Sequence, residues 1–494
     1  MVDAPGSGDG GKRKRKNVEK AKRRKLKRKI KELEKEIEAS KEAQLDESLY
    51  GLTPRVEAAI QRALSEDRLP ILPRLLRPLH PADQADLIER LEVADREKLI
   101  NAVGAQLDPE IYNELDDSIR EEVLELLGEE HIASALATLD SDDMIELFED
   151  LEDDEQQRIL KTLPAKDRMI LEEGLTYPEH SAGRLMQREL VVVPAHWTVG
   201  QTIDYLRTVQ TLPDDFYDIF VVDPAHRPVG ELALSHLLRT KRPVRVADIM
   251  RADFRRVPVE MDQEEVALLF RQYGLVAAPV VDEEDRLLGV ITVDDVVDVI
   301  HEEAEEDIMR MGGVSEIDRY DSLWDTTKQR FPWLVVNLLT AIAASLVIGL
   351  FEGAIEKVVA LAVLMPIVAS MGGNAGTQTL TVAVRSIAMR DLTPKSAVKF
   401  VAKETLVGSV NGVAFAILVA GVSIVWFGDY QIAWIIALAM VINMVIAGLV
   451  GTLIPLGLNR LEIDPAVASG VFLTTVTDVV GFFAFLGLAA LVLL

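Results

Sequence analysis

Residues 371–378, MGGNAGTQ, place three glycines and three polar side chains inside a long apolar segment. Hydrocarbon offers no partner to a free backbone N–H or C=O, so such a segment at membrane depth must face protein or water. We expect Pro366 and the glycines to break the helical hydrogen bonding and to free backbone carbonyls. The alternative is that the glycines serve close helix packing. Both interpretations place this stretch in a membrane domain, away from the lipid.

Five apolar segments divide the last third of the chain, at about 331–351, 358–387, 400–427, 432–458 and 465–492. Each approaches or exceeds the roughly 20 residues that cross hydrocarbon. Before residue 331 the apolar runs are strand-sized and the charges are dense, so a soluble half precedes the membrane half. Basic residues flank the first three spans on the side of the soluble half: Lys328, Arg330, Arg385, Arg390, Lys395 and Lys399. This pattern predicts an inner (cell) membrane protein with a cytoplasmic N-terminal half and an extracytoplasmic C-terminus.

The amino-acid composition limits the kinds of metal site and cross-link that the chain can form. The 494 residues include no cysteine, which excludes disulfides, iron–sulfur clusters and thiolate metal sites, and the seven histidines show no zinc-ligand spacing. Residues 1–40 carry a net charge of +8, so the rest of the chain carries −35 of the total of −27. Such an excess attracts cations, and a divalent metal is the partner it suggests. A merely solubilising surface is the alternative.

The soluble half begins with two different regions. Residues 1–52 begin as a basic block and continue into a short helix. We predict a flexible arm that either binds anionic lipid headgroups or RNA or is simply a solvated tail. Its GSGDGGKR lacks the Ser/Thr of a P-loop, so no ATPase motif is present. From 53 to 181 the pattern is helical, and the stretch LHPADQADLIERLEVADREKLI from Leu79 repeats as LDSDDMIELFEDLEDDEQQRIL from Leu139. This predicts a helical-repeat domain.

Residues 182–303 contain a second duplication, in which IFVVDPAHRPVGELALSHLL matches the later APVVDEEDRLLGVITVDDVV at a constant offset. This tandem resembles a pair of CBS domains, small α+β modules whose cleft often holds an adenine nucleotide. The resemblance implies that Thr292 and Asp295 contact the nucleotide. The first copy has Ala233 and His236 at these positions, so we expect at most one nucleotide per chain.

An acidic helix and linker, assigned to 304–330, follow the second copy. The segment DDVVDVIHEEAEED at 294–307 spaces its carboxylates three or four residues apart, with no Lys or Arg before Arg310. Like charges at that spacing destabilise a helix, so bound multivalent cations explain the run better than solubility does. The candidate metal ligands of the soluble half are Asp142, Glu146, Asp262, Glu264, Asp295, Asp298, Glu303, Glu306 and Asp307.

A lone acid, Asp478, lies near the middle of the fifth span in TTVTDVV. A carboxylate at that depth is costly and by default marks an ion pathway or a buried pair. Lys399 or Lys403 could pair with it, but Lys403 has Glu404 beside it and both lie near the end of their span. We therefore favour the ion pathway.

Domain order and motifs together resemble the MgtE family of magnesium channels over roughly residues 55–494. The resemblance implies a multidomain fold: an all-α helical-repeat domain, tandem α+β CBS domains, an acidic connecting helix and a five-helix α transmembrane domain (331–494). It also implies a homodimer with its pore at the subunit interface. The implied pore residues are Gly372, Gly373, Asn374, Gly376, Thr474 and Asp478, with Asp478 also a metal ligand.

This resemblance predicts a channel, not an enzyme, with Mg²⁺ as cargo and regulator and ATP as a candidate CBS ligand. Mg²⁺ gives up its water reluctantly, so a pore does best by recognising the hydrated ion. Cytosolic Mg²⁺ would bridge the acidic repeat domain, CBS pair and connecting helix into a compact, closed state. Membrane lipid is a partner and nucleic acid is not expected. The alternatives are a proton-coupled divalent cation carrier and a membrane-tethered metal or nucleotide sensor that transports nothing.

Overall fold

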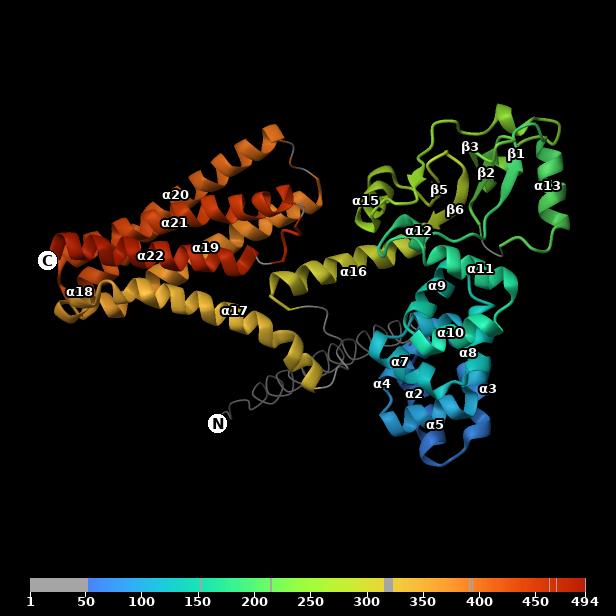
Figure 1. Cartoon of the computed structure of the whole chain (residues 1–494), viewed down its shortest axis with the longest axis horizontal. Coiled ribbons are helices and arrows are strands. Elements are labelled where there is room, and N and C mark those ends of the chain that lie inside the picture. Colours follow the sequence, from blue (N-terminus) through green and yellow to red (C-terminus); the bar gives the residue numbers. More distant parts are fainter. Residues whose placement is uncertain are drawn as a thin grey trace, which may run out of the picture. The chain divides into compact units, whose positions relative to one another are not determined.

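The computed structural model describes residues 52–493 except 152, 214–215, 315–322, 391, 393, 462 and 468. The predicted basic arm lies outside the described residues, apart from residue 52. The chain divides into two compact units, Met1–Thr176 and Tyr177–Leu494. Figure 1 colours their elements along the sequence.

The first unit is helical throughout its described part. Its helices are α2 (Pro54–Ser65), α3 (Leu72–Leu76), α4 (Pro81–Arg90), α5 (Val93–Val103), α6 (Glu110–Asn113), α7 (Asp117–Leu126), α8 (Glu129–Leu136), α9 (Ser141–Glu149), α10 (Asp153–Thr162) and α11 (Ala165–Gly174), with 3-10 turns at Leu69–Ile71 and Gly104–Gln106. The sequence repeat folds as predicted, because α4 and α5 correspond in sequence to α9 and α10. Leu87 and Leu147 are equivalent in the two copies and both are fully buried.

Buried arginines join α5 to α7 and α7 to α9 in this unit. Arg96 donates to Glu122 at 2.6 Å, and Arg120 donates to Glu146 at 2.8 Å, each across 26 residues of sequence. Arg120 also pairs with Asp150 at 3.0 Å. A buried guanidinium is tolerated only when it is paired, so these carboxylates have a structural partner.

The second unit begins with two small sheets of identical plan. Their strands are β1 (Val192–Pro194), β2 (Asp218–Val222), β3 (Pro228–Ala233), β4 (Val257–Pro258), β5 (Ala277–Val281) and β6 (Leu287–Thr292), in the orders β1-β2-β3 and β4-β5-β6. In each sheet the first pair is parallel and the second antiparallel, and a register shift recurs at Val221/Val222 and at Val280/Val281. The predicted duplication is therefore a structural duplication.

Helices flank the two sheets. They are α12 (Ala182–Leu185), α13 (Val199–Thr208), α14 (Leu234–Arg239), α15 (Gln263–Tyr273) and α16 (Val293–Met311), with a 3-10 turn at Val246–Asp248. The last of these is the predicted acidic helix, and it starts directly at the end of β6. Thr292 caps it in a capping box with Asp295, which satisfies N–H groups at its first turn.

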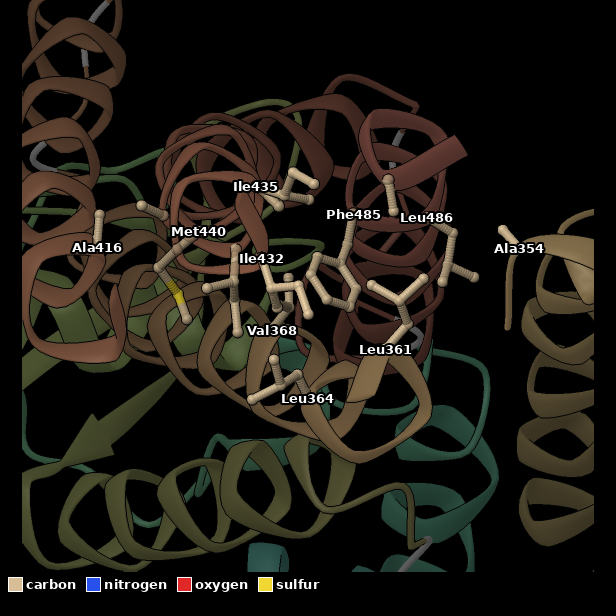
Figure 2. Packing of buried hydrophobic residues seen from close by; sticks show 14 of the residues in the cluster. Ala354, Leu361, Leu364, Val368, Ala416, Ile432, Ile435, Met440, Phe485 and Leu486 are labelled. Carbon is tan, nitrogen blue, oxygen red and sulfur yellow. The ribbon is translucent and has the colours of Figure 1, made fainter. Parts of the chain in front are cut away.

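The C-terminal part consists of long apolar helices. They are α17 (Leu323–Gly349), the short α18 (Glu352–Lys357), α19 (Ala360–Ala388), α20 (Pro394–Phe427), α21 (Tyr430–Arg460) and α22 (Ser469–Leu493). Five of them, all except α18, are long and apolar enough to cross a membrane, which confirms the five predicted spans. Side chains of α19, α20, α21 and α22 interlock in one apolar cluster, which includes Leu364, Met440 and Phe485 (Figure 2).

Candidate ion pathway

The glycine-rich segment of α19 stays helical, since the helix runs unbroken from Ala360 to Ala388. The expectation that Pro366 and the glycines would break the helix was wrong. Pro366 has no N–H and therefore leaves the Ala362 carbonyl without its helical partner, but residues 371–378 remain helical. A glycine costs a helix only about 1 kcal/mol relative to alanine, whereas each backbone group unpaired in hydrocarbon costs several times that. Two hydroxyls also bond within the helix: Thr377 donates to the Gly373 carbonyl and Thr381 to the Thr377 carbonyl, both at 2.9 Å. The polar chemistry of this segment therefore comes from its side chains.

Two of the three glycines let neighbouring helices approach α19 closely. A Cβ atom added at Gly376 would lie 2.8 Å from Leu473 Cδ1 of α22, and one at Gly372 would lie 2.7 Å from Asn443 Cγ of α21. A Cβ at Gly373 would meet nothing within 4 Å. Gly372 and Gly376 thus pack between helices, and Gly373 lies on the open side of α19.

The open side of α19 carries a polar row, which we define as Asn374, Thr377, Gln378 and Thr381. All four are exposed in the single chain. Their spacing of three, one and three positions places them along one face of a helix with about 3.6 residues per turn. Leu380, on the same turns, and Val384, on the next turn, are buried against other helices. The helix therefore has an apolar packed side and a polar unpacked side, both at membrane depth.

Asp478 lies in α22, which packs against α19. Its side chain is half-buried, and within the described part of the chain no hydrogen bond or ion pair reaches its carboxylate. Lys403, considered above as a partner for Asp478, pairs with Glu404 of its own helix, with 3.8 Å between Nζ and Oε1. One turn before Asp478, the Thr474 hydroxyl donates to the Gly470 carbonyl at 3.0 Å.

Sequence reasoning missed Asn443 of α21. This side chain is fully buried, and its Nδ2 donates to the Val368 carbonyl of α19 at 2.8 Å. The signal was available, because Asn443 is the one strongly polar residue in the run ALAMVINMVIAG. Polar residues inside apolar spans commonly hydrogen-bond neighbouring helices.

Four predicted metal ligands come together where α15 and α16 meet, and we call Asp262, Glu264, Glu303 and Asp307 the acidic contact. Partial desolvation, together with Glu303, Asp262 and Asp307, raises the pKa of Glu264 to about 7. Gln263 Nε2 donates to Glu303 Oε1 at 2.7 Å, which fixes one of the carboxylates. Carboxylates crowded in this way favour a bound proton or cation.

The far end of α16 is bonded to the connection between α21 and α22. Arg310 donates to Asp464 Oδ2 at 2.6 Å and also pairs with Glu306. Desolvation, together with the charges of Asp464 and Glu303, raises the pKa of Asp307. Glu306 therefore already has a cationic partner, whereas Asp307 faces other acids.

The remaining predicted ligands are dispersed. Glu146 pairs with Arg120, the Asp142 carboxylate accepts the backbone N–H of Asp143 at 3.0 Å, and Asp298 is exposed on α16. Among the described residues, no three acidic or histidine side chains are already arranged around a metal-sized site. The metal ligands therefore stay predictions.

The two predicted nucleotide contacts bond to each other. Thr292 Oγ1 donates to Asp295 Oδ2 at 2.7 Å, which leaves the second carboxylate oxygen of Asp295 for a ligand. Burial raises the pKa of Asp295 to about 6, although its hydrogen bonds from Thr292 oppose the rise. His236, at the equivalent position in the first copy, is exposed on α14.

Three family models match the chain in the order of its domains. The MgtE intracellular N domain matches residues 79–180, the CBS domain matches 246–302, and the MgtE divalent cation transporter domain matches 365–488. The magnesium transporter MgtE of Thermus thermophilus is 33% identical over 448 residues, which cover 89% of this chain and 99% of that protein. The chain belongs to the MgtE family. It is thus a member of a transporter family and not of an enzyme family.

One further relative supports this membership, and one solved structure is similar to part of the chain. The magnesium transporter MgtE of Bacillus subtilis is 31% identical and aligns over 83% of this chain and 91% of its own length. The solved cytosolic domain of the Mg²⁺ channel MgtE in complex with ATP is 33% identical, covers 49% of this chain and 99% of that one, and superposes with a TM-score of 0.47.

Proposed function

We propose that this protein is a channel for the passive entry of Mg²⁺ into the cytoplasm. The observation that carries the proposal is the polar row on the unpacked side of α19, inside a helix long and apolar enough to span a membrane. Amide and hydroxyl side chains facing lipid would each lose their hydrogen bonds with water. The row therefore faces a water-filled path.

A second copy of the chain supplies the other wall of this path. The row is exposed in the single chain, so the path opens onto the subunit surface and is not enclosed by one bundle. Closed two-fold symmetry is the commonest way to cover such a surface. A homodimer with its pore at the two-fold axis follows from these two points.

The side chains along the path suit a hydrated divalent ion. Mg²⁺ usually keeps several waters in protein sites, and the oxygens of Asn374, Gln378 and Thr377 accept hydrogen bonds from such water. Asp478 supplies negative charge without an internal counter-ion among the described residues. Gly373 keeps the wall open, while Gly372 and Gly376 hold α19 against its neighbours.

The acidic contact between α15 and α16 is proposed as the regulatory site. Cytosolic Mg²⁺ bound there neutralises Glu264, Glu303 and Asp307, favours the closed state and so limits uptake. A nucleotide at Thr292 and Asp295 would act on the same helix, because these residues form the first turn of α16. Both sites lie on the side that the basic flanking residues assign to the cytoplasm.

The test is ion flux into liposomes that contain the purified full-length chain. Mg²⁺, Ca²⁺, Co²⁺ and protons are followed separately at a set membrane potential. A channel gives Mg²⁺ flux that follows the potential with no coupled proton movement. Proton flux in fixed ratio to Mg²⁺ would identify the carrier alternative, and the absence of any ion flux would support a sensor.

Asp478→Asn is the matching variant. The substitution removes one negative charge from the pore wall of each subunit and leaves the size of the side chain almost unchanged. We therefore expect Mg²⁺ flux to fall by at least about tenfold. Asp429→Asn, at the start of α21, is a control outside the path. Unchanged Mg²⁺ flux and selectivity in folded Asp478→Asn would exclude a pore role for this acid.

A further inference from the structure

Asn443 occupies an unusual place in the membrane domain. It is fully buried in α21, and its Nδ2 donates to the carbonyl of Val368, whose side chain lies in the apolar cluster of Figure 2. Its Oδ1 is buried and has no hydrogen-bond partner among the described residues. The side chain thus reaches out of its own helix into a largely apolar interior.

Two glycines on two other helices make room for this amide. A Cβ at Gly372 of α19 would lie 2.7 Å from Asn443 Cγ, and a Cβ at Gly481 of α22 would lie 2.8 Å from Asn443 Nδ2. Real Cβ atoms essentially never approach other heavy atoms this closely. The amide is therefore held between α19 and α22 in a notch that alanine at either position would fill.

These glycines lie next to the residues of the proposed pore. Gly372 precedes Asn374 by two positions, and Gly481 follows Asp478 by three, which is less than one helical turn. Within the described part of the chain, Asn443 bonds to neither of these two pore side chains. It contacts the backbone segments that carry them.

Packing alone does not account for an amide at this position. Leaving Oδ1 buried without a partner is unfavourable, and an apolar side chain of similar size would avoid that cost. A buried polar group is directional, however, and can fix how helices are aligned along their axes where apolar contacts permit sliding. The hydrogen bond to Val368 provides that alignment for α19 against α21.

We propose that Asn443 is a positioning residue of the ion pathway, setting the relative height of Asn374 and Asp478 in the membrane. The inference rests on the proposed channel function. Asn443 acts through the backbones of α19 and α22 and does not itself contact the ion.

The first test is Asn443→Leu, which keeps the size and removes the hydrogen bond. We expect a folded dimer in which the preference for Mg²⁺ over Na⁺, measured from reversal potentials in planar bilayers, falls about tenfold, the factor that one buried hydrogen bond can supply. A reversal potential does not depend on the number of channels, so reduced folding or insertion alone leaves it unchanged. Unaltered selectivity in conducting Asn443→Leu would overturn the inference.

A second pair of substitutions, which enlarges residue 372 and shortens residue 443, tests the inference if Asn443→Leu fails to fold. Gly372→Ala should disrupt the domain, because its methyl group overlaps the amide, and Asn443→Ala added to it should restore folding without restoring selectivity. Gly457→Ala, in α21 with nothing within 4 Å of the new methyl group, is the control. Full selectivity in the double variant would refute the positioning role. A wild-type protein that carries no Mg²⁺ would instead refute the channel function, so the two failures are distinguishable.

Discussion

Individual side chains in this protein take their roles from their immediate partners. Glu146 and Glu264 are both acids on short helices of the soluble half, yet Glu146 meets the Arg120 guanidinium at 2.8 Å, whereas Glu264 meets Glu303 and other acids. An acid paired with a buried arginine stabilises the fold through its charge. An acid among acids is destabilised by its own charge and can be stabilised by a cation.

The acidic contact should therefore respond to pH in a defined direction. The pKa of Glu264 is raised from 4.5 to about 7, so the contact between α15 and α16 is strongest below pH 4.5 and weakens as the pH rises towards 7. In the full-length protein without divalent ions, hydrogen exchange of α15 and α16, corrected for intrinsic rates, should accelerate over this range. Glu264→Gln should flatten the dependence.

Glu260→Gln serves as the control for that experiment, because Glu260 is exposed and lies just before α15. Millimolar Mg²⁺ at a pH above the raised pKa of Glu264 should restore slow exchange in the unaltered protein and less so in Glu264→Gln. Equal pH dependence in both variants would show that Glu264 does not govern the contact.

At the scale of the element, α19 separates two kinds of small or polar residue onto two sides. Gly372 and Gly376 lie where α21 and α22 approach, and the polar row lies on the side that the described chain leaves exposed. A helix of about 3.6 residues per turn does this with the local pattern GGNAG, in which neighbours point in different directions. The unbroken helix is thus compatible with a polar path, provided that side chains and not carbonyls line it.

Single cysteines can test this division, because the chain contains no native cysteine. Thr377→Cys, Gln378→Cys and Thr381→Cys should react with a membrane-impermeant, water-soluble thiol reagent, since the polar row faces water. Leu380→Cys and Val384→Cys, at buried positions of the same helix, are the matched controls and should react at least about tenfold more slowly. Equal protection at all five positions would mean that α19 faces lipid or protein on every side.

On the scale of the whole molecule, the soluble half carries most of the negative charge and the membrane half most of the apolar surface. Outside positions 1–40 the net charge is −35, and in the described soluble domains several acids face other acids. Each bound Mg²⁺ removes two charges of mutual repulsion and can join two carboxylates. Monovalent salt only screens them, over about 8 Å at physiological ionic strength.

Mg²⁺ should therefore protect the soluble half in a way that NaCl does not. Limited proteolysis of the full-length protein in detergent should slow with added MgCl₂ and change little with NaCl of equal ionic strength. Replacing Asp262, Glu264 and Glu303 together with Gln or Asn should remove most of the Mg²⁺ effect. Equal protection by NaCl would reduce the acidic excess to general electrostatics and leave only the pore proposal.

The sequence by itself determined the parts that depend on local pattern. The helical repeat, the duplicated sheets, the five spans and the acidic helix all follow from periodicity, turn residues and segment length, which act over short stretches of chain. These features were predictable because their partners lie within one element or recur in a copy of it.

Tertiary structure alone decided which side of each element is packed. Only the approach of α21 and α22 separates Gly372 and Gly376 from Gly373, and only the fold brings Asn443 to Val368, 75 residues away. The same holds for Arg120 and Glu146, which come from different helices. Contacts between distant segments depend on how helices pack in three dimensions, and a periodic pattern shows that a helix has two sides without showing what each side meets.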